Sequence, residues 1–241
     1  MSRFSQRSSE TELMDDLELA NDALRKNLDE LETINTYLGG NAVTLMGLNQ
    51  LLLPNYPNSD RTIRIADLGC GGGDGLRAMA RWGRKKGVKL ELIGIDANPF
   101  MLEYANEKAR NYPEIQFEQH NIFDQDFQRQ PYDIITCSLF CHHFSDEELV
   151  RFFQQWYQQT SMGVVINDIH RHYLAYHSIY WLTRIFRGSY LVKNDAPLSV
   201  LRAFSDRELK ELMAQAEINP FKMSWKWAFR WLLLFGKAVK S

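Results

Sequence analysis

Residues 65–74 read IADLGCGGGD, an apolar segment that ends in an acid and is followed by a run of glycines. This pattern predicts a buried strand that leads into a ligand-binding turn. Gly69, Gly71 and Gly73 have no Cβ, so they can adopt positive φ and let the backbone approach a bound molecule closely. A helical pattern follows over residues 76–82. A strand, a glycine turn and a helix in this order predict the first unit of an α/β sheet, which binds its ligand beyond the carboxyl ends of the strands.

Two acids, Asp67 and Asp74, flank these glycines, whose spacing is Gly-x-Gly-x-Gly. A dinucleotide-binding turn has the spacing Gly-x-Gly-x-x-Gly, and a P-loop continues into Lys-Ser or Lys-Thr, which does not follow here. Carboxylates repel phosphates by roughly 1 kcal/mol in water and by several times more in a partly desolvated cleft. The loop therefore favours a positively charged ligand such as S-adenosylmethionine, which carries an ammonium and a sulfonium, over a nicotinamide dinucleotide.

A second apolar run, LELIGI at residues 90–95, ends at Asp96 and is followed by another helical pattern. An acid at the end of the second strand can accept hydrogen bonds from both hydroxyls of a ribose. Together, Asp-x-Gly-x-Gly-x-Gly at residues 67–73 and Gly-Ile-Asp at residues 94–96 closely resemble motifs I and II of the class I S-adenosylmethionine-dependent methyltransferases. The resemblance implies S-adenosyl-L-methionine as cofactor. It also implies a Rossmann-like, seven-stranded, mostly parallel α/β sheet with helices on both faces and a terminal antiparallel hairpin.

The resemblance extends to the segments after the third and fourth predicted strands. Residues 120–123 read HNIF, where such enzymes usually have an acid and an apolar residue that frame the adenine; Asn121 replaces the acid and can accept a hydrogen bond through its amide oxygen. Residues 137–144 read CSLFCHHF and resemble motif IV, which implies that Ser138 and Leu139 lie near the transferred methyl. In this family an N-terminal element often covers the cofactor. The residues thus assigned to the cofactor are Tyr37, Asn41, Asp67, Gly69, Cys70, Gly71, Asp74, Asp96, Ala97, Met101, Asn121, Ile122, Ser138 and Leu139.

The candidate catalytic bases are histidines at the carboxyl ends of two predicted strands. A methyl group on a sulfonium is already activated, so the enzyme mainly aligns the nucleophile, and a base is needed only to remove its proton. His142 and His143 follow the fourth strand, and either could serve a phenol or an enol. His170 follows the fifth strand, where Asp168 could fix its tautomer and Arg171 could hold an anionic oxygen.

A metal site is the alternative interpretation of these histidines. It would join His142 and His143 to Cys137 and Cys141, or His170 to two nearby histidines. Side chains on a strand alternate between faces, and the Cys-x3-Cys spacing is not accompanied by a second ligand pair. We therefore predict no metal ion.

The chain divides by its pattern into an N-terminal helical extension or cap, residues 1–60, and a methyltransferase domain, residues 61–241. A capping box at residues 9–12 and apolar residues at steps of three and four predict a long helix or helix pair that ends at Gly39 and Gly40. Residues 172–200 are an aromatic-rich insertion, predicted to be a lid over the substrate. Strands are predicted at 63–68, 89–95, 115–119, 132–138 and 164–168, a second capping box at 205–208, and the hairpin at 222–229 and 231–239.

Composition bounds the remaining possibilities. With 241 residues, 45% hydrophobic and 24% charged, the chain can bury a full core as one domain with an appendage. A formal net charge of -2 gives no reason to expect a nucleic-acid partner. The sequence contains neither a secretory pattern nor an apolar run of transmembrane length, and its three cysteines predict reduced thiols and a cytoplasmic protein. The oligomeric state is left open between monomer and homodimer.

The expected acceptor is a hydrophobic small molecule. Residues 167–171, NDIHR, and 198–204, LSVLRAF, resemble bacterial small-molecule methyltransferases that accompany type III polyketide synthases, and the motifs also resemble ubiquinone- and menaquinone-type methylases. This implies O-methylation of a phenolic, quinol or polyketide-type acceptor in small-molecule biosynthesis. C-methylation of a quinone-type acceptor, a non-catalytic S-adenosylmethionine-binding module and a nicotinamide oxidoreductase remain as alternatives. Arg184 and Arg187 beside the aromatics also allow peripheral contact with anionic lipid.

Overall fold

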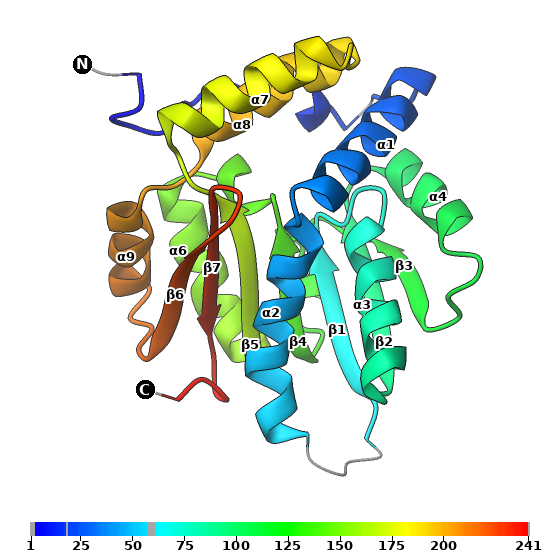
Figure 1. Cartoon of the computed structure of the whole chain (residues 1–241). Coiled ribbons are helices and arrows are strands. Elements are labelled where there is room, and N and C mark those ends of the chain that lie inside the picture. The colour runs from blue at the N-terminus through cyan, green and yellow to red at the C-terminus, as the bar shows by residue number, and fades with distance from the viewer. Residues whose placement is uncertain (1–2, 18, 57–60, 241) are drawn as a thin grey trace.

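A seven-stranded sheet forms the centre of the molecule (Figure 1), for which a computed structural model describes residues 3–17, 19–56 and 61–240. The strand order is β3-β2-β1-β4-β5-β7-β6; β1 to β5 are parallel, and β7 runs antiparallel to both β5 and β6. The predicted Rossmann-like fold with a terminal antiparallel hairpin is therefore confirmed. The strands are β1 Ile63–Leu68, β2 Leu90–Asp96, β3 Ile115–Gln119, β4 Tyr132–Ser138, β5 Thr160–Ile169, β6 Phe221–Lys226 and β7 Arg230–Phe235.

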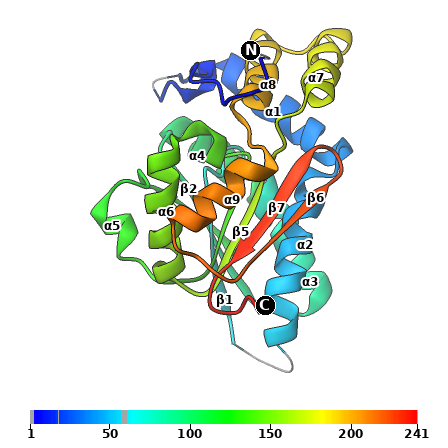
Figure 2. The same ribbon diagram turned by 90° about the vertical axis from the view of Figure 1, so that its left-hand side faces the viewer.

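Helices cover both faces of this sheet (Figure 2), because the parallel strands are apolar on both sides and must be buried on both. One face packs against Leu48 of α2, Met79 of α3 and Leu102 of α4. The other packs against Phe127 of α5 and Phe153 of α6, with α9 behind. The helices are α2 Gly40–Leu52, α3 Asp74–Lys86, α4 Pro99–Lys108, α5 Gln125–Gln128, α6 Asp146–Gln159 and α9 Asp206–Gln215.

Local sequence signals set the ends of the helices that flank the ligand-binding edge. Helix α3 starts directly after Gly73, which adopts a left-handed φ of 69°, and ends at Gly87, with a φ of 67°. Helix α9 starts at the predicted capping box, in which the Ser205 hydroxyl accepts from the Glu208 amide and the Glu208 carboxylate accepts from the Ser205 amide. Because α3 starts directly after Gly73, the loop between β1 and α3 is short and stays at the carboxyl edge of the sheet.

Three helices lie above this carboxyl edge: α1 Asp22–Tyr37, α7 Tyr173–Ile185 and α8 Tyr190–Arg202 (Figure 1). Helices α7 and α8 pack against each other, and α8 also contacts α1. The carboxylate of Glu30 on α1 accepts hydrogen bonds from the amide and the hydroxyl of Ser189, the N-cap of α8. The insertion predicted at residues 172–200 thus forms a helical layer over the strand ends. None of the described helices is both long and apolar enough to cross a membrane.

The N-terminal helix begins later than predicted. Residues 9–12 are not helical; a short 3-10 turn, Leu13–Asp15, follows, and α1 begins only at Asp22 with Asn21 as its N-cap. The reason is tertiary: the Glu12 carboxylate, expected to complete a capping box with Ser9, is buried against the sheet edge instead, while Asp195 of α8 accepts from the amides of residues 13 and 14. Residues 3–17 therefore form an extended segment across the strand ends, which we call the N-terminal strap.

Candidate active site

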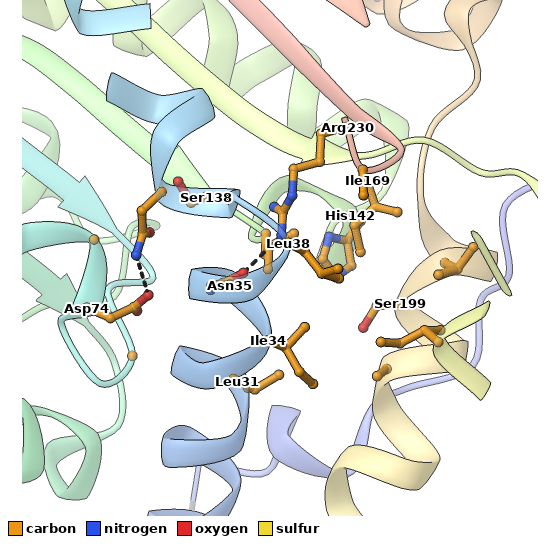
Figure 3. A pocket seen from close by; sticks show the side chains of 18 of the residues that line it. Leu31, Ile34, Asn35, Leu38, Asp74, Ser138, His142, Ile169, Ser199 and Arg230 are labelled. Carbon is orange, nitrogen blue, oxygen red and sulfur yellow. Dashed lines mark hydrogen bonds between the residues drawn. The ribbon is translucent and has the colours of Figure 1, made fainter. Parts of the chain in front are cut away.

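Two adjoining cavities, each of about 370 Å³, lie at the carboxyl edge of the sheet. Both are lined by Gly69, Gly71, Leu139, His143 and Met14 of the strap, so they meet at the glycine loop. One of them, which we call the loop cavity, extends over the ends of β2 and β3. The other, which we call the lid cavity, extends under α1, α7 and α8, and Figure 3 shows part of it. Every predicted cofactor residue except Tyr37 lines one of them: Asp96, Ala97, Met101, Asn121 and Ile122 line the loop cavity, Asn41, Asp67, Cys70, Asp74 and Ser138 the lid cavity, and Gly69, Gly71 and Leu139 both.

The glycine loop is built for close approach. Gly69 has a φ of 63° and Gly71 a φ of 49°. A Cβ on Gly69 would lie 2.1 Å from the Phe140 ring, so no other residue fits this position. The Asp96 carboxylate fixes the loop, because Oδ2 accepts from the Gly71 amide at 3.0 Å and Oδ1 accepts from the Asn98 amide at 3.0 Å. Each oxygen keeps a second lone pair that a ligand hydroxyl can use.

Three acids surround this loop with no basic side chain of the described residues within ion-pair distance of them. Burial raises the pKa of Asp67 to about 7; its hydrogen bond from Thr136 at 2.7 Å opposes this, and the charges of Asp74 and Asp96 add to it. Burial also raises the pKa of Asp96. Asp74 accepts a hydrogen bond of 2.9 Å from the Asn41 amide. A cationic ligand would relieve the mutual repulsion of these carboxylates, whereas a phosphate would increase it.

His142 is held between two carboxylates and is almost fully buried. Its Nδ1 lies 2.7 Å from Oδ1 of Asp168, and its Nε2 lies 3.5 Å from Oε1 of Glu12 in the strap. Burial alone would lower the pKa of His142, but the charge and hydrogen bond of Asp168, together with Glu12, raise it to about 9. His142 is therefore cationic near neutral pH and unsuited to accept a proton. Asp168, predicted to orient His170, orients His142 instead.

His143 lies where the two cavities meet. Its Nδ1 is 2.6 Å from Oδ1 of Asp15, whose other oxygen accepts from Arg202 at 2.7 Å. Burial alone would raise the pKa of Asp15, but His143 and Arg202 hold it well below its usual range. A carboxylate at Nδ1 favours the tautomer with its proton there, which leaves Nε2 free to accept one.

The segment that carries this site is similar to known methyltransferases. The family model described as a methyltransferase domain matches residues 65–163, which include the glycine loop, Asp96, Asn121 and both histidines. Over residues 65–163 the chain is therefore similar to the methyltransferase-domain family. An uncharacterized methyltransferase, YcgJ of Bacillus subtilis strain 168, is 33% identical over 85 residues, or 34% of this chain. The match spans only 31% of the length of that curated relative.

Solved methyltransferases share the fold well beyond the matched segment. The plantazolicin methyltransferase BpumL in complex with SAH superposes with a TM-score of 0.65 at 18% identity, covering 89% of each chain. Magnesium protoporphyrin IX methyltransferase from Synechocystis PCC 6803 gives 0.54 at 15% identity, covering 91% of this chain and 89% of its own. Human N-acetylserotonin methyltransferase in complex with SAM gives 0.60 at 13% identity, covering 88% of this chain and 55% of its own. At these identities the likeness supports the fold alone.

The methyltransferase cofactor fits the residues present. S-adenosylmethionine combines a ribose and an adenine, which require hydrogen-bonding partners, with two positive charges. The loop cavity offers Asp96 and Asn121, and the unpaired acids Asp67 and Asp74 lie where the lid cavity meets the glycine loop. Gly69 and Gly71 supply a surface without side chains between them.

Some of the predicted site residues lie away from both cavities. Tyr37 is 85% exposed and lines neither cavity, whereas Asn35 of the same helix and Leu38, its C-cap residue, line the lid cavity. His170 likewise lines neither; its ring packs on Trp231, with centroids 4.9 Å apart. Arg171 cannot hold a ligand oxygen, because its guanidinium is committed to Glu208 at 2.6 Å and to the carbonyls of Phe4 and Ala203.

The structure also bears on the metal interpretation. The Sγ atoms of Cys137 and Cys141 lie 3.8 Å apart, both buried. Glu12, His142 and His143 are the one group of three potential ligands that the described residues bring within 4.8 Å of one another. Positive charge already occupies this group, because His142 is cationic and Arg202 lies 3.9 Å from Oε1 of Glu12. A metal-free site stays our prediction.

Titration of Asp67 gives a first test of the cofactor site. Its pKa near 7 means that the carboxyl is largely protonated at pH 6, and a ligand ammonium favours the carboxylate. Binding of S-adenosylhomocysteine, which keeps that ammonium, should therefore release a proton and strengthen about tenfold from pH 6 to pH 8. Calorimetry in buffers of different ionisation enthalpy measures both quantities. The Asp67→Asn variant should bind weakly at both values; an equal rise with pH in that variant would contradict the assignment.

Proposed function

We propose that this chain transfers a methyl group from S-adenosylmethionine to an oxygen of a hydrophobic small molecule, a phenol, a quinol or a related polyketide-type compound. The observation that carries the proposal is the lid cavity. It shares Gly69 and His143 with the loop cavity, and its far walls are apolar side chains of the helices above the sheet. An acceptor in that cavity can reach a methyl group presented at the glycine loop.

The same geometry supports our proposed roles for the cofactor residues. Asp96 would accept from the ribose hydroxyls, Asn121 would accept from the adenine amino group, and Asp67 would face the ammonium. Ser138 and Leu139 would lie beside the reacting centre: Ser138 Oγ is 2.8 Å from Thr44 Oγ1, and Leu139 has a φ of 55°. A non-glycine residue in that conformation costs free energy and is found mostly where a site requires it. When bound, the cofactor supplies a methyl group on a sulfonium, which the acceptor attacks in line.

His143 is the proposed base. It lines both cavities, and Asp15 favours the tautomer in which Nε2 can accept a proton. His142 would instead be a positioning residue that ties the strap to the sheet edge through Glu12 and Asp168. His170 has no role in this proposal, because it lines neither cavity.

The acceptor's apolar part would lie under the helical layer. Figure 3 shows Leu31 and Ile34 of α1, and Leu38 directly after it, on one side of the lid cavity. Ile179 and Leu182 of α7 also line it. Side chains of this kind suit an alkyl chain or an aromatic ring, which burial drives into the cavity.

Mass spectrometry of reaction products tests the function. The purified protein is incubated with S-adenosylmethionine and, separately, with alkylphenols, pyrones, quinols and quinones. Methylation of a hydroxyl is the expected product, and methylation of a ring carbon would favour C-transfer instead. Binding of S-adenosylhomocysteine without turnover of any acceptor would support the non-catalytic binding module.

We propose further that the acceptor enters from a lipid surface beside α7. Three large apolar side chains near the end of this helix, Trp181, Ile185 and Phe186, are exposed by 59%, 70% and 76%, and Arg187 is exposed next to them. Such a mixture is typical of helices that lie on anionic bilayers. Co-sedimentation with phosphatidylglycerol vesicles should fall severalfold in Phe186→Ser. The Met46→Ser variant, at an exposed position of α2, should behave as wild type; equal loss in both would argue against a defined surface.

A further inference from the structure

Arg230, at the start of β7, is a buried cation that the proposed mechanism does not yet use. Its side chain lines the lid cavity, and the residue is only 5% exposed. In Figure 3 it extends toward the cavity above Asn35 and His142. Burial lowers the pKa of Arg230 to about 10, against the attraction of Asp168 and Asp74, so the guanidinium remains charged near neutral pH.

Arg230 differs from the other buried arginines of the described chain. Arg77 lies 2.8 Å from Glu32, Arg171 lies 2.6 Å from Glu208, and Arg202 lies 2.7 Å from Asp15. No carboxylate of the described residues lies within ion-pair distance of Arg230. Its guanidinium donates instead to two neutral amide oxygens, those of Asn35 at 2.9 Å and Asn167 at 3.5 Å. A buried charge without a counter-ion is costly, and an anion from outside would relieve that cost.

The surroundings hold the guanidinium ready for such an anion. The Asn167 amide donates to the Gly40 carbonyl at 2.9 Å and to Thr44 Oγ1 at 3.0 Å, which turns its oxygen toward Arg230. A Cβ on Gly40 would come within 2.8 Å of the guanidinium, so the charged group packs directly on the start of α2. The planar fork of donors is therefore fixed before any ligand arrives.

The position of Arg230 in the sheet indicates that its counter-ion would come from the acceptor. The loop cavity lies over the ends of β2 and β3, and Arg230 does not line it. In the sheet, β5 lies between β7 and β4, and both β5 and β4 lie between β7 and β1. The guanidinium thus lies on the side of the lid cavity away from the predicted ribose and adenine partners, where the acceptor would bind.

We propose that Arg230 binds the ionised oxygen of the acceptor, a phenolate or an enolate. The inference rests on the proposed function, and it defines the acceptor as a weak acid whose conjugate base pairs with the guanidinium. An opposite charge within hydrogen-bonding distance lowers the pKa of an acid by about 1 to 3 units, so a phenol with an ordinary pKa of about 10 would titrate at about 7 to 9 when bound here. The proton passes to His143 or to water. Arg230 in this way takes the role that the sequence suggested for Arg171.

A chromogenic weak acid tests this directly. The protein saturated with S-adenosylhomocysteine is titrated with 4-nitrophenol, whose phenolate absorbs at longer wavelength than the phenol. The apparent pKa of the bound probe should lie at least about one unit below that of the free compound. In Arg230→Met it should return to the free value or rise above it. In Arg151→Met, which removes an equal charge from an exposed site on α6, the lowered pKa should persist.

The controls separate this inference from the proposed function. Failure of the wild type to bind S-adenosylhomocysteine would remove the proposed function itself. Binding of S-adenosylhomocysteine with no lowered pKa for nitrophenol would overturn only the role of Arg230. A tenfold loss of S-adenosylhomocysteine affinity in Arg230→Met, with the nitrophenol pKa still lowered, would assign the guanidinium to the cofactor carboxylate and also overturn it.

A second variant covers the case in which Arg230→Met does not fold, as judged by circular dichroism. Arg230→Lys keeps the charge and should keep the lowered pKa of the probe; loss of the effect in a folded Arg230→Lys protein would contradict the assignment.

Titration with 4-nitrobenzoate distinguishes a carboxylate from a phenolate. Binding of the benzoate ten times tighter than that of nitrophenol would replace the phenol class by a carboxylic acid.

Discussion

Replacing Asp96 by Ala should weaken the binding of S-adenosylhomocysteine by roughly 1 to 3 kcal/mol, up to about a hundredfold in affinity. The carboxylate has two tasks in our account: it accepts from the ribose hydroxyls, and it fixes the glycine loop through the amides of Gly71 and Asn98. Removing it leaves the ribose without a charged acceptor and the loop without its tether. Isothermal titration calorimetry of the two proteins measures the difference.

Two variants control this result. Asp96→Asn keeps the shape and one acceptor oxygen, so it should lose less affinity than Asp96→Ala. Asp124→Ala removes an exposed acid close to the loop cavity and should bind as wild type does. Unchanged affinity in a folded Asp96→Ala protein would refute the ribose assignment.

Replacing His143 by Ala should lower kcat roughly a hundredfold with an acceptor identified by the product screen, because general-base catalysis contributes factors of that size. The loss should be greatest for weakly acidic phenols and small for acceptors that are already ionised in solution. This dependence on acceptor acidity separates loss of a base from a general disturbance of the site. Steady-state kinetics over a series of substituted phenols provide the measurement.

The matched control is His170→Ala. This histidine also follows a strand of the sheet, but it lines neither cavity, and its variant should turn over at close to the wild-type rate. Full activity of His143→Ala on every phenol would show that no side-chain base is required and that proximity and ionisation of the acceptor carry the reaction. Inactivity of His170→Ala alone would restore the interpretation from sequence.

The sheet and the cofactor loop could be predicted from sequence because their signals are local. A glycine at a left-handed position, an acid at the end of a strand and a capping box each act within a few residues, and Gly69, Asp96 and Ser205 illustrate the three cases. Parallel strands then bring their carboxyl ends to one edge of the sheet whatever the intervening helices are. Residues 65–74 therefore indicate, by their pattern alone, the edge of the sheet at which both cavities lie.

The remainder of the site depends on contacts between distant segments. Glu12 follows a helix-start pattern, yet its carboxylate is buried beside His142 and Arg202, which no pattern near residue 12 reveals. The pairing of Asp168 with His142 rather than His170 likewise depends on how two neighbouring strands end. The sequence marks Arg230 only as a charged residue at the start of the apolar run RWLLLF. That it is buried without an acidic partner among the described residues is visible only in three dimensions.

The most direct test of the central claim is calorimetry of the purified protein with S-adenosylhomocysteine, with NADH as the comparison. Our account predicts micromolar binding of S-adenosylhomocysteine and no binding of NADH, because Asp67 and Asp74 favour the ammonium of the former and, with Asp96, repel the pyrophosphate of the latter. Binding of NADH, or of neither compound, would contradict the assignment of the cofactor site and of every residue placed around it.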